Sequence, residues 1–202
     1  MSRNTATRVL GEALKGAEDG ELFLEYRQSE MLGFDDGRLK TASFDTSQGF
    51  GLRAVKGETT AYAHANEISE SALKRAASTV SAVSRQGAGA DVSASPKGTN
   101  QSLYTPENPL AALEFEAKVA LLQTIDAYAR AADPRVAQVS ASITGEWQAV
   151  EILRPDGFSA RDIRPLVRFN VSVMLRDGTK QETGSFGCGG RSSYGAFLSE
   201  AK

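Results

Sequence analysis

Between Leu166 and Leu175, apolar residues occupy every second position. The members of this series are Val167, Phe169, Val171, Val173 and Leu175. A period of two is typical of a β-strand that buries one face in a core. Asp177-Gly178 follows directly, and an Asp-Gly pair readily adopts the positive φ angles of a tight hairpin turn. The sequence therefore predicts that residues 179–186 return as an antiparallel strand.

The predicted return strand leads into a glycine-rich stretch, Gly187-Cys188-Gly189-Gly190-Arg191. Glycine leaves backbone amides uncovered, so a ligand or another polypeptide can approach them closely. The stretch lacks the lysine-containing pattern of a nucleotide-binding P-loop. We therefore expect a contact with a peptide or with another domain, and the candidate residues are Gly184, Ser185, Gly187, Gly189, Gly190 and Arg191.

The first half of the chain, about residues 1–85, has a helix at each end and extended segments between. A short amphipathic helix is predicted over Thr5–Ala17, where apolar residues share one helical stripe. Extended segments begin at Glu21 and are interrupted by a break near Thr46-Ser47, which implies four or five strands. Ser69 is the predicted N-cap of the second helix.

The second half, residues 110–202, follows a connection over residues 86–109. That connection is rich in Gly, Ser, Thr and Pro and shows no sustained period, so we expect an exposed segment. A helix is predicted from about Leu113 to Ala132, with Phe115 on its buried side, and Asp133-Pro134 ends it. Extended segments then return.

The two halves repeat one pattern: a helix, strands divided at an Asp-Gly turn, and a further strand after a single-glycine turn. The Asp-Gly turns are Asp36-Gly37 and Asp156-Gly157, and the single-glycine turns are at Gly57 and Gly178. The predicted fold is α+β, with two similar antiparallel β-meander sheets and helices packed on one face.

Composition excludes several classes of function. The net charge is −2, whereas a nucleic-acid surface needs clustered Lys and Arg, so we expect no nucleic-acid partner. No apolar run is long enough for a signal peptide or a membrane span, so we expect no membrane partner. A single cysteine rules out an internal disulfide and fits a reducing compartment. A cytoplasmic location is the expectation.

The residues show no complete active site. Zinc catalysis needs two or three His, Cys or carboxylate ligands on a rigid frame, and the chain has one histidine, His64, and one cysteine, Cys188. Both lie just after the single-glycine turn of their half, so a Cys-His hydrolase remains one alternative. A non-catalytic dimerisation module is another. No catalytic or metal-binding residue is assigned.

The run DGFSARDIRPLVRFNVSVMLRDGTKQETGSFGCGGRSSYGAFL resembles the N-terminal domain of the TldD/PmbA ("modulator of DNA gyrase") metallopeptidases, in its TldD-like form. The resemblance extends through SLYTPENPL, VSASITGEW, DDGRLK and QGFGLRAVKGETTAYAHANEIS, and so covers nearly the whole chain. It implies that residues 1–202 are a TldD/PmbA-like N-terminal domain.

The resemblance also implies a function. Members of this family are cytoplasmic zinc peptidases that cleave unfolded peptides, and TldD pairs with an inactive paralogue, TldE (PmbA). Their zinc-binding His-Glu-x-x-x-His motif lies in a later domain and is absent up to Lys202. We therefore expect a substrate-handling and assembly domain that is inactive as a fragment and holds no cofactor itself, with zinc in the full-length protein. The expected partners are an unfolded peptide and either a second copy or a TldE (PmbA)-like paralogue.

Overall fold

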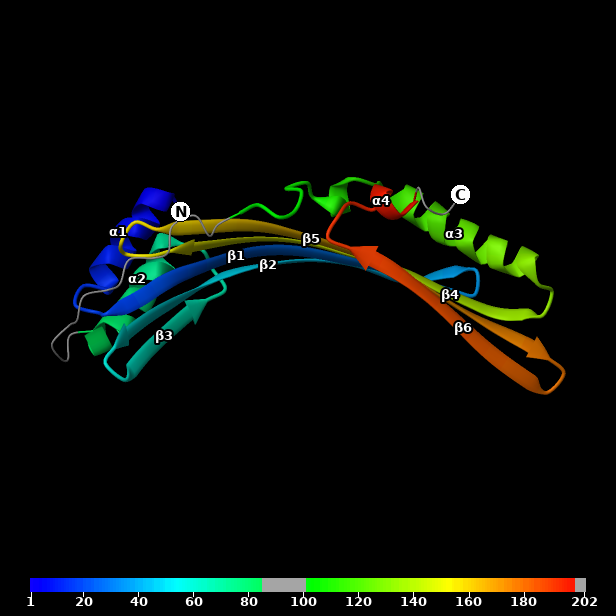
Figure 1. Ribbon diagram of the computed structural model, residues 1–202, viewed down its shortest axis with the longest axis horizontal. Coiled ribbons are helices and arrows are strands. Elements are labelled where there is room, and N and C mark those ends of the chain that lie inside the picture. The colour runs from blue at the N-terminus through cyan, green and yellow to red at the C-terminus, as the bar shows by residue number, and fades with distance from the viewer. Residues whose placement is uncertain (85–100, 199–202) are drawn as a thin grey trace. The chain divides into compact units, whose positions relative to one another are not determined.

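A computed structural model describes residues 1–84 and 101–198, and over these residues the fold is α+β (Figure 1). The elements, in chain order, are α1 (Arg3–Ala13), β1 (Asp19–Asp35), β2 (Arg38–Lys56), β3 (Thr59–Ala65), α2 (Glu70–Ser84), the 3-10 helix η1 (Pro109–Ala111), α3 (Phe115–Ala132), β4 (Val136–Leu153), β5 (Ser159–Asp177), β6 (Lys180–Gly190) and α4 (Gly195–Leu198). The predicted fold class is confirmed.

The strands form a single six-stranded sheet in the order β3-β2-β1-β4-β5-β6. Each half of the chain contributes a three-stranded meander, as the repeat predicts, but the expectation of two sheets is corrected. The meanders are joined because β1 pairs with β4. This pairing removes one exposed edge from each meander.

The strands are longer than the sequence suggests. The break expected near Thr46-Ser47 is wrong, because β2 runs unbroken from Arg38 to Lys56, and the first half therefore has three strands. β4 likewise continues through Gly145. Polar residues and glycine do not end a strand whose backbone is paired on both sides.

The predicted turns are confirmed. Asp36 and Gly37 both have positive φ, 49° and 76°, as a two-residue type I′ hairpin requires. Between β5 and β6 only Gly178 has positive φ, 59°, which is the pattern of a type II′ turn. Asp177 pairs with Lys180 directly across this turn, so the expected return strand is confirmed and extends to Gly190.

The described residues form two compact units that do not follow the two halves of the sequence. Of the described residues, unit 1 comprises 1–27, 47–84, 101–102 and 149–162, and unit 2 comprises 28–46, 103–148 and 163–198. The strands β1, β2, β4 and β5 each contribute residues to both units.

In unit 1, α1 and α2 cover one face of the sheet. Its core residues with no exposed surface are Leu10, Leu22, Leu52, Leu73 and Val80. Ser69 is the N-cap of α2, as predicted, because its Oγ accepts a hydrogen bond from the Ala72 N–H at 3.1 Å.

In unit 2, α3 packs on one face of the sheet over a core that includes Leu122, Ile143 and Val167. The expectation that Phe115 points inward is wrong, because 49% of its surface is exposed at the first residue of the helix. Of the predicted connection, residues 86–100 lie outside the described residues, and residues 101–108 form no helix or strand.

Candidate functional site

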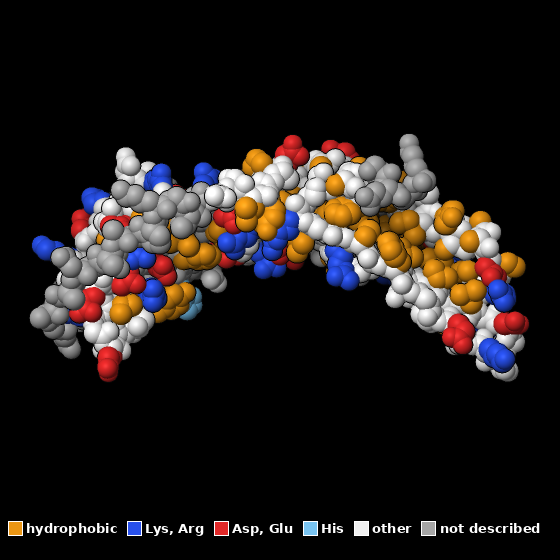
Figure 2. Space-filling view, in the orientation of Figure 1, with side chains coloured by type: hydrophobic (Ala, Val, Ile, Leu, Met, Phe, Trp, Pro, Cys, Tyr) orange, Lys and Arg blue, Asp and Glu red, His pale blue; other side chains and the backbone are white. Residues whose placement is uncertain are grey.

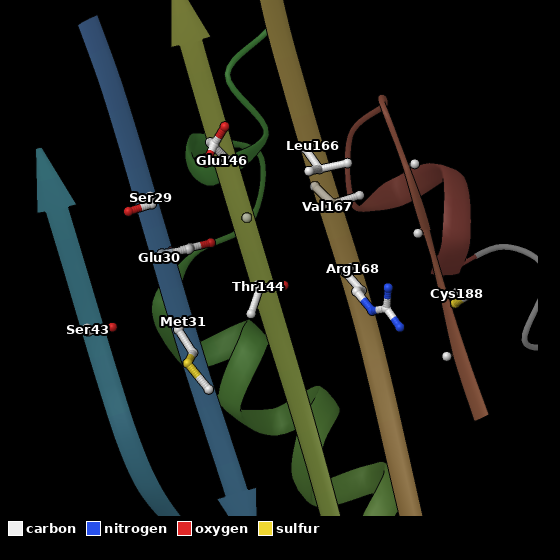
Figure 3. A pocket seen from close by; sticks show the side chains of 14 residues that line it. Ser29, Glu30, Met31, Ser43, Thr144, Glu146, Leu166, Val167, Arg168 and Cys188 are labelled. Carbon is white, nitrogen blue, oxygen red and sulfur yellow. The ribbon is translucent and has the colours of Figure 1, made fainter. Parts of the chain in front are cut away.

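The face of unit 2 away from α3 contains an open hollow of about 640 Å³ (Figure 3). Alternate residues of neighbouring strands line it, because alternate side chains share a face. The lining includes Ser29 and Met31 of β1, Thr144 and Glu146 of β4, Leu166 and Arg168 of β5, and the stretch Gly187–Gly190 of β6. The β6 side is therefore backbone, while the other strands present side chains.

The space around each glycine of β6 differs. A Cβ atom at Gly189 would lie 2.3 Å from the carbonyl oxygen of Val167, and one at Gly187 would lie 2.8 Å from Oδ1 of Asn170. Nothing lies within 4 Å of a Cβ atom at Gly184, so that glycine is not required by packing. A side chain is thus excluded at Gly189 by the backbone of β5, whereas at Gly187 the nearest atom is the end of the Asn170 side chain, which can move.

Arg168 is the cationic residue of the hollow. Its Nε donates to Oδ1 of Asn170 at 2.9 Å, which fixes the side chain along β5. Figure 3 shows the guanidinium reaching from β5 toward β6. A guanidinium carries five N–H donors, so it can bind the carbonyl or carboxylate oxygens of a chain lying in the hollow.

β6 is the last strand of the sheet, so one side of its backbone pairs with no other strand of the described chain. In a two-residue hairpin the pair flanking the turn is doubly hydrogen-bonded, and the hydrogen-bonded pairs then alternate along the strands. Counting from Asp177 and Lys180 along the observed register, residues 181, 183, 185, 187 and 189 direct their N–H and C=O groups outward. Ser185, Gly187 and Gly189 have small side chains or none, so the outward groups at this end are accessible.

Five of the six predicted contact residues lie on β6, and they fall into two sets. Ser185, Gly187 and Gly189 lie at outward positions, whereas Gly184 and Gly190 pair inward with Val173 and Val167. Arg191 follows the strand, and its guanidinium lies 5.2 Å from the centre of the Tyr104 ring. A role for any of the six in binding stays a prediction.

A buried polar network lies on the α3 side of the sheet, and the sequence analysis did not identify it. Lys118 is 3% exposed, and its Nζ contacts Oε1 of Glu30 at 2.7 Å and the carbonyl oxygen of Leu110 at 2.7 Å. The hydroxyl of Tyr194 donates to the same Glu30 carboxylate at 2.7 Å. Burial, followed by the hydrogen bond to Glu30, raises the pKa of Tyr194 well above its usual range, so the hydroxyl remains a donor.

Gly145 makes room for this network. A Cβ atom there would lie 2.2 Å from the Tyr194 hydroxyl and 2.5 Å from Cδ2 of Leu110. The Tyr194 ring also packs edge-on against Phe169, with 5.6 Å between centroids. The network therefore fixes the segment after β6 against the sheet. The sequence contains one indication that this lysine is buried, because Lys118 lies one helical turn before Leu122 and so on the same face of the helix.

His64 and Cys188 have unrelated surroundings. His64 lies on β3 opposite Gly51, and its ring stacks on Tyr62. Cys188 lies on β6 opposite Phe169 and packs against the core of unit 2. β3 and β6 are the first and last strands of the sheet, with four strands between them. The Cys-His dyad is therefore wrong, because the halves join through β1 and β4 and not through β3 and β6.

The described residues do not fit a catalytic metal. Within residues 1–84 and 101–198, no three His, Cys, Asp or Glu side chains are grouped so that they could hold an ion. Three protein ligands are the usual minimum for a catalytic zinc. In the same residues, no helix is long and apolar enough to cross a membrane.

Two domain descriptions of one family match the chain. "PmbA/TldA metallopeptidase domain 1" matches residues 20–84, and "PmbA/TldA metallopeptidase central domain" matches residues 108–201. The chain belongs to the PmbA/TldD family. It is 39% identical over 173 residues to a metalloprotease TldD homologue from Haemophilus influenzae, covering 85% of the chain and 36% of that protein.

Two further PmbA/TldD proteins are similar to this chain, one in sequence and one in fold. A metalloprotease TldD homologue from Buchnera aphidicola subsp. Schizaphis graminum is 32% identical over 181 residues, 90% of the chain and 38% of that protein. The fold is similar to the crystal structure of TldE from Thermococcus kodakarensis, with a TM-score of 0.75 at 14% identity, over 93% of the chain and 43% of that structure. The chain thus spans well under half the length of the PmbA/TldD proteins it matches.

Proposed function

We propose that this chain is the substrate-handling and assembly region of a TldD-like zinc metallopeptidase and binds unfolded polypeptide as an added strand along β6. Family membership supports the peptidase context. The observation that carries the proposal is the free edge of β6, whose outward backbone groups border the hollow next to Gly187 and Gly189. Main-chain hydrogen bonds do not depend on side-chain identity, so binding of this kind accepts many sequences.

Arg168 gives this surface a second point of attachment. Its guanidinium lies on the same face as the bare backbone of β6 and can donate to carbonyl oxygens of the added strand. Each hydrogen bond contributes about 0.5–1.5 kcal/mol net, and ordering the peptide offsets part of that gain. Weak, exchangeable binding is therefore expected, which suits delivery of a substrate to a catalytic centre elsewhere.

The metal and the catalytic step belong, in this proposal, to protein outside this chain. The absence of a fitting ligand group among the described residues is the reason for assigning zinc elsewhere. The expected setting is cytoplasmic. The expected assembly partner is a second copy or a TldE (PmbA)-like paralogue, in line with the likeness of this fold to TldE.

The β6 surface is tested by titrating a fluorescent, unfolded peptide into the chain and measuring anisotropy. Ser185→Pro removes one outward N–H donor without removing an inward pair to β5, so it should weaken binding about threefold to tenfold. Ser185→Ala keeps the donor and should bind normally. Equal affinities for all three proteins would remove the β6 edge from the proposal.

Catalytic dependence is tested separately. The purified chain, incubated with zinc and the same peptide, should produce no cleavage above buffer. Cleavage by the chain alone would contradict the assignment of the metal to another region. The remaining alternative is a dimerisation module. Such a module would form dimers in light scattering but would leave the anisotropy of the fluorescent peptide unchanged.

A further inference from the structure

Unit 1 has a hollow of its own, of about 300 Å³, on the face of the sheet away from α1 and α2. Three neighbouring strands line it: β1 with Phe23 and Glu25, β2 with Gly49 and Gly51, and β3 with Tyr62 and His64. Gly49 and Gly51 on the middle strand leave part of its floor without side chains, while β1 and β3 supply the walls. We call it the β3 hollow.

The wall formed by β3 is aromatic and accessible. A Cβ atom at Gly51 would lie 2.4 Å from the Tyr62 hydroxyl, so the Tyr62 ring lies across the middle strand at this point. The ring is 61% exposed and stacks on His64, with 5.7 Å between centroids and 27° between planes. The histidine appears in pale blue at the surface, next to hydrophobic side chains (Figure 2).

The opposite wall carries a half-buried carboxylate. Glu25 lines the hollow and has no hydrogen-bond or ion-pair partner among the residues that the structure describes. It shares the hollow with the rings of Phe23 on the same strand and of Tyr62 and His64 on β3. A partly desolvated carboxylate attracts a cation, and the faces of Phe and Tyr rings carry negative potential that attracts the same charge.

We propose that the β3 hollow binds an organic cation, an ammonium or a guanidinium group. Its aromatic surface and single negative charge match such a group, whereas an anion would meet Glu25 unfavourably. The cation comes either from a lysine or arginine side chain on a polypeptide or from a free small molecule. The site lies in unit 1 and does not depend on the proposed role of β6.

His64 provides the measurement because it is the only histidine in the chain. Its imidazole C–H signals are followed by NMR during titration with tetramethylammonium, with a capped Gly-Gly-Lys-Gly-Gly peptide, and with the neutral Gly-Gly-Gln-Gly-Gly peptide. The two cationic probes should shift the signals saturably, and the neutral peptide should not. A lysine peptide that binds at least tenfold more tightly than tetramethylammonium identifies a polypeptide side chain as the ligand, and equal affinities identify a free cation.

Variants of the site decide the assignment. Glu25→Gln keeps the shape of the side chain and should weaken binding of the lysine peptide about fivefold, and Tyr62→Leu should weaken it about threefold. Glu58→Gln changes an exposed carboxylate between β2 and β3 that does not line the hollow, so it should leave binding unchanged. Identical shifts with the glutamine peptide, or unchanged affinity in Glu25→Gln, would overturn the proposal. Neither result depends on peptide binding at β6, which the Ser185→Pro variant reports separately.

Discussion

Gly189 and Gly184 occupy the same strand but should respond oppositely to alanine. At Gly189 the new methyl group would collide with the backbone of Val167, so Gly189→Ala should destabilise the fold by about 2 kcal/mol. At Gly184 there is open space, so Gly184→Ala should change stability by less than about 0.5 kcal/mol. Urea denaturation measures both. Equal losses would show that the glycines are needed for a reason other than strand spacing.

Glu30 and Lys118 form a buried ion pair, and removing one partner alone should be costly. Lys118→Met leaves the Glu30 carboxylate buried without its ammonium partner, and a loss of about 3–5 kcal/mol is expected. Lys118→Met combined with Glu30→Leu removes both charges and should recover part of that loss, because the buried Tyr194 hydroxyl then lacks its acceptor. Chemical denaturation of the two single variants and the double variant completes the cycle. A double variant as unstable as the sum of the singles would contradict coupling between the two residues.

Tyr194 should make stability sensitive to alkaline pH. Its pKa is raised in the folded state, so folded and unfolded chains bind the same proton below the ordinary tyrosine pKa of about 10. Above that pH the unfolded chain loses the proton while the folded chain keeps it, so unfolding becomes more favourable as pH rises. Thermal denaturation between pH 8 and 11 should show this fall in stability. Tyr194→Phe should be less stable at pH 8 but lose less on going to high pH.

At the scale of the element, the sequence was most informative about turns and strand faces. The Asp36-Gly37 and Gly178 turns follow from local backbone preferences, which a few residues determine. The pairing of β1 with β4 could not be predicted, because it depends on strands far apart in the chain. The pairing of Lys118 could not be predicted for a related reason, because its partners Glu30 and Tyr194 become its neighbours only after folding.

The alternation of backbone groups on β6 gives a direct test of its register. Amides of residues 182, 184, 186 and 188 pair with β5, whereas those of 181, 183, 185 and 187 point outward. Amide hydrogen exchange followed by NMR should therefore show slow and fast exchange at alternate residues. A uniform rate along β6 would indicate that the hairpin register is wrong or that another chain covers the edge.

At the scale of the whole molecule, four strands carry residues of both compact units. Unfolding one unit therefore disrupts strands that also belong to the other, and we expect a single cooperative transition. Leu73→Ala in unit 1 and Leu122→Ala in unit 2 should each cost about 2–5 kcal/mol and shift that one transition. Calorimetry of the two variants would contradict shared cooperativity if each change moved a separate transition.

The free side of β6 also has a consequence for the behaviour of the protein at high concentration. If its row of backbone donors and acceptors accepts a foreign chain regardless of side chains, as proposed, it also accepts an unfolded copy of the protein. Conditions that partly denature the population therefore supply strands that cap native molecules or extend into ladders. Crowding and mild heating should favour such growth, and short soluble peptides that occupy the same edge should slow it.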